Sequence, residues 1–283
     1  MTLAEAVRHA AARLEERNAP EQNPALDAEV LARHVLGWGR AQWIAGNRDD
    51  APATFISRFD ELIDRRLAGE PVAYLTGTRE FWGLDFDVTP AVLIPRPETE
   101  FLVERALAEI DRLRGSAARP LTVADVGTGS GCVSIALAHE RPALHVIATD
   151  ISERALDVAR RNAARHGVDG RIDFRLTPVL EDVGTVDLVV SNPPYIATGD
   201  AAGMMADVRD YEPHSALFSG VDGLHVIRAL LADVSRRDPA PPLLFEFGRN
   251  EAAVREAIAA SGLRLRAIVN DLAGIPRIAV VER

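Results

Sequence analysis

The stretch that decides the fold is Val123-Ala124-Asp125-Val126-Gly127-Thr128-Gly129-Ser130-Gly131, an apolar run that opens through three glycines. Residues 132–138, Cys-Val-Ser-Ile-Ala-Leu-Ala, continue it with a helical pattern. This order predicts a strand that turns through glycines into a helix, where a ligand can approach the backbone closely. The spacing lacks the sixth-position glycine of the dinucleotide fingerprint, and the chain has no lysine to complete a Walker motif.

Strand and helix patterns alternate on both sides of this turn, which predicts an α/β fold with a parallel sheet and helices on both faces. Further apolar runs that predict strands lie at residues 144–149, 171–174, 186–190 and 242–247. The last two runs, 263–269 and 277–281, have no helical pattern between them. We therefore expect the final pair of strands to be antiparallel.

The N-terminal part of the chain has a different pattern and predicts a separate domain. Apolar residues recur there at helical spacing, and we expect a helical bundle over residues 1–75, with Leu26, Val30 and Leu31 in its core. Residues 76–97 predict a β-hairpin linker, in which runs 81–88 and 92–94 flank a turn at 89–91. Residues 98–283 then form the α/β domain, with a surface connection at 114–120.

Composition excludes several classes of protein. Of the 283 residues 47% are hydrophobic and 26% are charged, as in globular chains, and no apolar stretch is long enough to span a membrane. The start of the chain, residues 1–17, is charged and amphipathic rather than signal-like. A single cysteine and seven histidines without metal-ligand spacing predict no disulfide and no metal, and they favour a reducing cytoplasm. A net charge of -10 argues against nonspecific binding to nucleic acid, and we do not expect direct nucleic-acid binding.

The most informative chemical motif is Asn192-Pro193-Pro194-Tyr195, directly after the apolar run 186–190. The prolines fix their own φ angles and favour an extended Asn192, so the Asn192 side chain and the Pro193 carbonyl become rigid acceptors for one NH2 group. Tyr195 is expected to pack on the flat group that carries this NH2. A strand that ends in a proline-rich turn is the alternative. The motif indicates methylation of a planar nitrogen.

Two further residues have two interpretations each. Asp150, at the end of run 144–149, can accept hydrogen bonds from ribose hydroxyls or can cap the helix that begins near Ser152. Cys132 stands where a helix dipole can lower the pKa of a thiol, but a small packing residue is the favoured role.

The chain resembles the PrmC/HemK family of release factor glutamine methyltransferases, whose fold is that of class I S-adenosylmethionine-dependent methyltransferases, a Rossmann-like seven-stranded sheet. The resemblance extends over nearly the whole chain. It is carried by the glycine turn, by Asn192 to Tyr195, and by the segments Leu26 to Glu29, Pro71 to Gly77, Ile94-Pro95-Arg96-Pro97-Glu98-Thr99-Glu100, Tyr211-Glu212-Pro213 and Asp271 to Arg277.

What the resemblance implies is N5-methylation of the glutamine in the Gly-Gly-Gln motif of peptide chain release factors, with S-adenosylmethionine as cofactor and the helical domain as a docking site for the protein substrate. By matching position, Asp150 holds the ribose and Asn192 also borders the cofactor. Asn192, Pro193 and Tyr195 are the catalytic candidates, and Asn192 to Tyr195 hold the glutamine. The cofactor turn is lined by Gly127, Thr128, Gly129, Ser130 and Gly131.

One departure from the family pattern concerns the adenine end. Where the family has an acidic residue followed by an aromatic, this chain has Thr177-Pro178-Val179.

Two alternative functions stay open at this stage. One is a nucleic-acid amino methyltransferase, which would flip a base into the same site and bind with a steep salt dependence. The other is a noncatalytic module that binds release factors or ribosomes but no cofactor.

Overall fold

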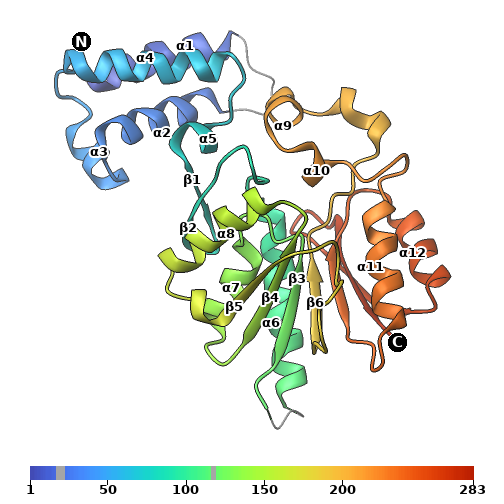
Figure 1. Cartoon of the computed structure of the whole chain (residues 1–283). Helices are drawn as coiled ribbons and strands as arrows, with labels where there is room; N and C mark the ends of the chain where they lie inside the picture. Colours follow the sequence, from blue (N-terminus) through green and yellow to red (C-terminus); the bar gives the residue numbers. More distant parts are fainter. Residues whose placement is uncertain (17–22, 116–118) are drawn as a thin grey trace. The chain divides into compact units, whose positions relative to one another are not determined.

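The computed structural model describes residues 1–16, 23–115 and 119–283 (Figure 1). Part of the predicted connection 114–120, residues 116–118, lies outside the described residues, as does the end of the predicted amphipathic start at residue 17. Contacts divide the chain into two compact units. One consists of Met1–Thr78 and Met204–Tyr211, and the other of Arg79–Gly203 and Glu212–Arg283. The predicted domain boundaries 1–75, 76–97 and 98–283 stay predictions.

The first unit is helical. Thr2 begins its first helix with a capping box, since Thr2 Oγ1 accepts from the Glu5 backbone and the Glu5 carboxylate accepts from the Thr2 backbone. Leu3, Leu14 and Phe59 lie in the apolar core of this unit. Its helices are α1 (Leu3–Glu15), α2 (Pro24–Leu36), α3 (Arg40–Gly46), α4 (Ala53–Leu67), α5 (Val72–Thr76) and α9 (Ala206–Tyr211).

The predicted core of α2 is partly wrong. Leu31 is fully buried and Val30 is half-buried, but Leu26 is 52% exposed. The buried stripe of α2 runs through Ala28, Leu31 and Ala32, which share one face of the helix, and Leu26 lies outside it. Leu26 belongs instead to the first turn, where Asn23 caps the helix by accepting from the Leu26 backbone.

The hairpin exists, but its turn is not the predicted one. Strands β1 (Thr78–Phe81) and β2 (Leu84–Asp87) form the two-stranded sheet and are joined by Trp82 and Gly83. Both joining residues have positive φ, 55° and 71°, the conformation of the tight turns that suit the twist of a hairpin. Residues 92–94 form no strand, because the chain after β2 turns at 89–92 and runs on without a partner strand among the described residues.

The second unit is a seven-stranded sheet covered by helices, which confirms the predicted fold class. The strand order is β5-β4-β3-β6-β7-β9-β8; the first five are parallel, and β9 runs antiparallel to both neighbours. The predicted antiparallel ending is therefore confirmed. The strands are β3 (Thr122–Val126), β4 (His145–Asp150), β5 (Ile172–Leu176), β6 (Leu188–Ser191), β7 (Leu243–Glu246), β8 (Arg264–Asn270) and β9 (Pro276–Glu282).

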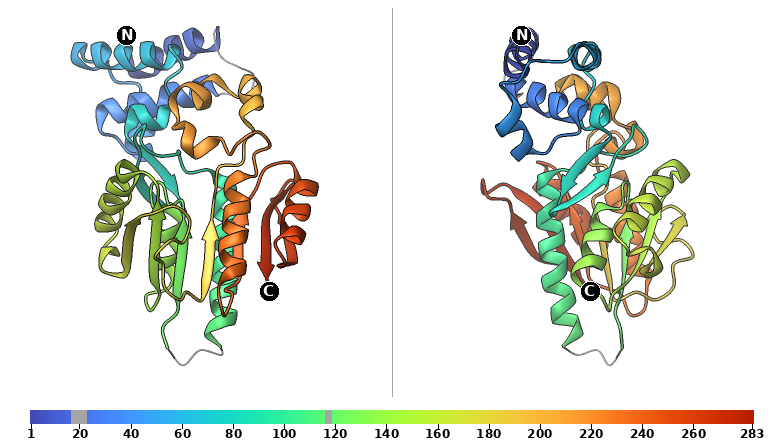
Figure 2. Two further views of the ribbon diagram at one scale, coloured as in Figure 1. Left: turned by 45° about the vertical axis from the view of Figure 1, so that its right-hand side comes forward. Right: turned by 90° about the vertical axis from the view of Figure 1, so that its left-hand side faces the viewer.

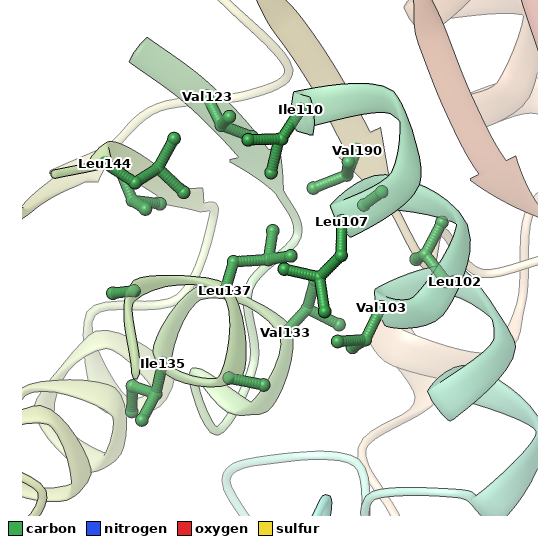
Figure 3. Close-up of a cluster of buried hydrophobic side chains, with 14 of the residues drawn as sticks. Leu102, Val103, Leu107, Ile110, Val123, Val133, Ile135, Leu137, Leu144 and Val190 are labelled. Atoms are coloured by element: carbon green, nitrogen blue, oxygen red, sulfur yellow. The ribbon is translucent and has the colours of Figure 1, made fainter. Parts of the chain in front are cut away.

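Both faces of this sheet are covered, which explains why its interior strands, such as β6 and β7, are nearly continuous apolar runs. Alternate strand residues point to opposite sides: Val123 packs with one buried cluster and Ala124 with the other. Helices α6 and α7 cover the first face (Figure 3) and α11 and α12 the second (Figures 1 and 2). The helices of this unit are α6 (Glu100–Arg114), α7 (Cys132–Glu140), α8 (Glu153–Arg165), α10 (His214–Leu217), α11 (His225–Arg236) and α12 (Glu251–Ala260), with short 3-10 turns at Pro97–Thr99, Asp169–Arg171 and Thr198–Gly203.

The strand order reverses between β3 and β6. From β3 the chain proceeds outward through β4 to β5, and it then returns to the other side of β3 with β6 and β7. In open α/β sheets ligands bind outside the carboxyl ends of the strands at such a reversal. The glycine turn follows β3 and the Asn-Pro-Pro-Tyr motif follows β6, so both sequence motifs flank this point.

Candidate active site

The register of the sheet brings three predicted segments to one edge. Val126 pairs with Thr149 of β4 and with Ser191 of β6. The next residues along each strand are Gly127, Asp150 and Asn192, so all three leave the sheet from one row. The Ser191 hydroxyl donates to the Val126 carbonyl at 2.7 Å, which ties the ends of β3 and β6 together.

These segments line one cavity of about 300 Å³. That volume is at the lower end of small-molecule sites. Among the sequence-predicted site residues the structure brings together eight in its wall: Gly127, Thr128, Gly129, Ser130, Asp150, Asn192, Pro193 and Pro194. Further parts of the wall come from residues around Val92, Arg96 and Thr99, from 177–179, and from the segments that include Ser215 and Val226.

The glycine turn is held from below by Asp125, a carboxylate inside β3 that is 1% exposed. Its Oδ2 accepts from the Thr128 hydroxyl at 2.7 Å, from the Ser134 hydroxyl at 2.6 Å and from the Ser134 backbone at 3.2 Å. Burial raises the pKa of Asp125, while the hydrogen bonds from Ser134 and Thr128 oppose that rise. The turn is thus anchored on both its strand and its helix side.

Asp150 joins two backbone segments through its carboxylate. Oδ2 accepts from the Gly129 backbone and Oδ1 from the Ser152 backbone, each at 2.9 Å. The N-cap of α8 is Ser152, whose hydroxyl accepts from Ala155, so the alternative that Asp150 itself caps this helix is not what the structure shows. Burial raises the pKa of Asp150, against the effect of these backbone donors. Two carboxylate oxygens offer about four acceptor positions, more than these backbone donors occupy, so acceptor capacity remains for a ligand.

Asn192 is held by a side chain far away in the sequence. Its Nδ2 donates to Thr99 Oγ1 at 2.9 Å, and Thr99 Oγ1 donates to Glu246 Oε2 at 2.7 Å. In the part of the chain that the structure describes, no donor is paired with Asn192 Oδ1 or with the Pro193 carbonyl. Both acceptors that the sequence predicted for an NH2 group are therefore available at the cavity wall.

Two predicted site residues do not line this cavity. Gly131 has φ +82° and lies at the start of α7, where an added Cβ would stand 3.2 Å from Ala159 Cβ. Tyr195 lines a second cavity, beside Gly248 and Phe247, and its hydroxyl is 3.4 Å from Glu246 Oε1. Burial and the neighbouring carboxylate raise the pKa of the Tyr195 phenol. Its predicted packing on a substrate group stays a prediction.

The segment Thr177-Pro178-Val179 does line the cavity. The Thr177 hydroxyl donates to the Glu181 carbonyl, and the Val179 carbonyl accepts from Thr149. Val179 has φ 49°, an unusual conformation for a β-branched residue, so its placement is imposed by these contacts. The segment presents no carboxylate and no aromatic ring to the cavity.

Cys132 lines the cavity as well, but not as a reactive thiol. Burial raises the pKa of Cys132 to about 12, against the lowering that its helix position alone predicts. It packs with the buried cluster under α6 and α7, which confirms the favoured role as a small packing residue.

Within residues 1–16, 23–115 and 119–283, no group of three His, Cys, Asp or Glu side chains could hold a metal ion. No helix of those segments is both long and apolar enough to cross a bilayer.

Sequence analysis missed the roles of Asp125, Thr99 and Glu246. For Asp125 and Glu246 a signal existed, since each is a carboxylate inside an apolar strand run, Val-Ala-Asp-Val and Leu-Leu-Phe-Glu-Phe. A buried charge is costly and marks a position with a special role. Thr99 carried no such signal beyond its place in the 94–100 motif.

Comparison with known proteins agrees with this geometry. Residues 5–77 match the family model of the PrmC N-terminal domain, and residues 105–208 match that of the methyltransferase small domain. A release factor glutamine methyltransferase of Koribacter versatilis (strain Ellin345) is 40% identical over 285 residues, with 99% of this chain and 98% of that protein covered.

The chain belongs to the release factor glutamine methyltransferase family. Its relative in Burkholderia pseudomallei (strain K96243), of the same name, is 45% identical over 262 residues, covering 89% of this chain and 90% of that protein. The family resemblance predicted from sequence is therefore confirmed, and this member of the family is an S-adenosylmethionine-dependent methyltransferase.

Solved structures support the fold of this family member. The catalytic domain of hMettl16, crystallised with the MAT2A 3′UTR hairpin 6, superposes with a TM-score of 0.55 and 18% identity, covering 78% of this chain and 81% of that one. At this identity the likeness concerns the fold alone.

Proposed function

We propose that this enzyme transfers the methyl group of S-adenosylmethionine to N5 of the glutamine in the Gly-Gly-Gln motif of peptide chain release factors. The observation that carries the proposal is the pair of available acceptors, Asn192 Oδ1 and the Pro193 carbonyl, at a cavity that also contains the glycine turn. The names of the full-length relatives support release factors as substrates.

The cavity fits the cofactor at three points. Gly127 and Gly129 have φ +73° and +56°, and a Cβ added at either would meet nothing within 4 Å, so a ligand can reach the backbone there. Asp150 keeps acceptor capacity for a ribose hydroxyl. Val126, Val133 and Val226 add apolar wall for the flat and aliphatic parts of the molecule.

S-adenosylmethionine, when bound, supplies an electrophilic methyl group on a sulfonium centre. The residues of the chain must solve a different problem, because the lone pair of an amide nitrogen is delocalised into the carbonyl. Asn192 Oδ1 and the Pro193 carbonyl would each accept one hydrogen of the glutamine NH2. Both acceptors are fixed, Asn192 by Thr99 and Pro193 by its ring, so positioning supplies most of the rate enhancement.

No carboxylate lies within the Asn192-to-Tyr195 motif, so the proposal assigns no strong general base to it. The proton leaves the nitrogen after methyl transfer, to water or to a carbonyl.

We propose further that residues 1–75 help to dock the release factor, and that the reaction takes place in the cytoplasm, where release factors act in translation. Direct binding of nucleic acid is no part of this proposal.

The test is transfer of labelled methyl from S-adenosylmethionine to a purified release factor, run beside a factor whose Gly-Gly-Gln glutamine is replaced. The proposal predicts label in the first factor and none in the second. Label that persists in the replaced factor would move the site elsewhere on the protein. Label found only on ribosomal RNA or DNA, with binding that weakens steeply with salt, would replace the proposal by a nucleic-acid substrate.

A further inference from the structure

Glu246 is a buried carboxylate next to the site that the mechanism above does not use. It ends β7 and is 1% exposed, in a run of residues whose other members, Leu244, Phe245 and Phe247, are buried and apolar. In the described part of the chain it forms no ion pair with an arginine or a histidine. Burying a charge without a counter-ion costs folding free energy, so we expect this carboxylate to have a functional role.

The direction of the hydrogen bonds around Glu246 follows from its charge. An ionised carboxylate can only accept, so the Thr99 hydroxyl must donate its proton to Glu246 Oε2, at 2.7 Å. The Thr99 oxygen then has only lone pairs to offer Asn192, which must turn its NH2 toward Thr99, at 2.9 Å. Asn192 Oδ1 is thereby left as the group available to the cavity.

The same carboxylate reaches the other end of the motif. The Tyr195 hydroxyl lies 3.4 Å from Glu246 Oε1. The Tyr195 ring lies against Gly248, two residues after Glu246, where a Cβ would stand 2.9 Å from the ring. Glu246 is therefore linked to both Asn192 and Tyr195, the first and last residues of the motif.

We propose that Thr99 and Glu246 are positioning residues that set the orientation of the Asn192 amide, so that its oxygen and not its NH2 faces the methyl-accepting group. This inference rests on the proposed function, because only an NH2-bearing substrate needs an acceptor at that point. An amide in the reverse orientation would present a donor to the substrate NH2 and would repel it.

The proposal makes the orientation depend on the charge of Glu246. A protonated Glu246 can donate to Thr99, which then donates to Asn192 Oδ1 and reverses the amide. Burial raises the pKa of Glu246 to about 7. The titratable and charged groups that face it are Glu98 beside Thr99, Tyr195, Cys132 of α7 and Arg277 of β9. Within this net rise, Glu98 acts in the same direction as burial, and Arg277 opposes it.

The first experiment compares Thr99→Val, which keeps the shape but removes the hydroxyl, with Thr99→Ser, which keeps the hydroxyl. Thr122→Val, at the end of β3 away from the glycine turn, is the matched control for the substitution itself. Thr99→Val is expected to lower kcat on release factor by about 10- to 100-fold with cofactor Kd unchanged, and Thr99→Ser to restore most of the rate. A folded Thr99→Val enzyme with wild-type kcat would overturn the proposal.

A double variant separates positioning from a structural role. If Thr99 acts only through Asn192, then Thr99→Val combined with Asn192→Ala should be no slower than Asn192→Ala alone. Losses that multiply would show that Thr99 supports the rate independently of Asn192 and would contradict the proposal. Melting temperatures of all four proteins report whether each variant is folded.

The pH profile of kcat is the second experiment, and it does not depend on Thr99→Val folding. The wild-type kcat should fall as pH decreases through about 7, which gives the pH profile an acid limb. Glu246→Gln cannot ionise at this position and should lack this decrease. An acid limb that persists unchanged in Glu246→Gln would overturn the assignment to Glu246.

A third measurement needs no substrate and keeps this inference separate from the proposed function. The side-chain NH2 of Asn192, assigned by nuclear magnetic resonance through its loss in Asn192→Ala, should exchange slowly in the wild type and faster in Thr99→Val. If the wild type labels no release factor, the proposed function fails, while this exchange still tests the hydrogen-bond chain from Glu246 through Thr99 to Asn192. Equal exchange rates in the two proteins would overturn the proposed role of Thr99 even in an active enzyme.

Discussion

Replacing Gly131 by alanine should destabilise the α/β unit more than the same change at Gly129. Gly131 has φ +82°, in the left-handed region that costs a residue with a Cβ about 1–2 kcal/mol. Its added Cβ would also stand 3.0 Å from Ile135 Cδ1, 3.2 Å from Ala159 Cβ and 3.3 Å from Ala159 Cα. Ala159 belongs to α8, so relief of this contact requires a helix to move, at about 1–3 kcal/mol.

These two costs sum to about 2–5 kcal/mol for Gly131→Ala, and only the first applies to Gly129→Ala, whose Cβ meets nothing within 4 Å. For a unit of roughly 200 residues 1 kcal/mol shifts Tm by about 2–4 °C, so the expected losses are roughly 4–20 °C and 2–8 °C.

Differential scanning calorimetry measures the losses, and titration calorimetry measures cofactor binding. Gly129→Ala should instead weaken cofactor Kd by about tenfold, because its Cβ enters the cavity. Equal melting temperatures for the two variants would refute the packing argument at Gly131, and unchanged cofactor affinity in Gly129→Ala would refute the assignment of the turn to the cofactor.

Three further predictions follow from the site and its surroundings. Asn192→Ala should lower kcat by about a hundredfold or more with cofactor Kd less affected, in steady-state kinetics beside calorimetry; near-normal turnover would refute its role. Pro178→Asp should tighten cofactor Kd by about tenfold, because the segment 177–179 offers the adenine no carboxylate, and an unchanged Kd would contradict this placement of the adenine. At Glu109 burial raises the pKa, but Arg266 and Arg112 outweigh it and lower the pKa to about 2. Since the pKa of Glu109 is lower in the folded than in the unfolded protein, about 3 kcal/mol of stability should be present above pH 5 and lost between pH 5 and 2. Chemical unfolding measured against pH should show this loss in the wild type and not in Glu109→Gln. The same acid dependence in both proteins would refute the role of Glu109.

Much of the fold was predictable because the interior strands of the sheet are buried on both faces. Such strands become apolar runs, and runs such as 186–190 are visible without any knowledge of their partners. The hairpin was harder, because its turn depends on Trp82 at positive φ, a conformation that a tryptophan gives no reason to expect. The prediction that Leu26 is buried was wrong because an apolar residue in the first turn of a helix need not lie on the buried stripe of that helix.

The site was predictable only in part. The glycine turn, Asp150 and Asn192 each lie at the carboxyl end of a strand, so strand order alone predicts that they meet. Thr99 and Glu246 are 93 and 51 residues away from Asn192 and Tyr195, respectively, and no local pattern predicts those contacts. The position of the Tyr195 ring in a second cavity depends on the glycine at 248, which the motif itself does not contain.

The central claim is that the methyl group goes to one side-chain nitrogen of one glutamine. The most direct measurement is tandem mass spectrometry of the peptide that contains Gly-Gly-Gln, after reaction of the release factor with this enzyme and S-adenosylmethionine. The account predicts one added methyl group that fragments with the glutamine side-chain amide. A methyl group on the backbone, on another residue or on another molecule would contradict it.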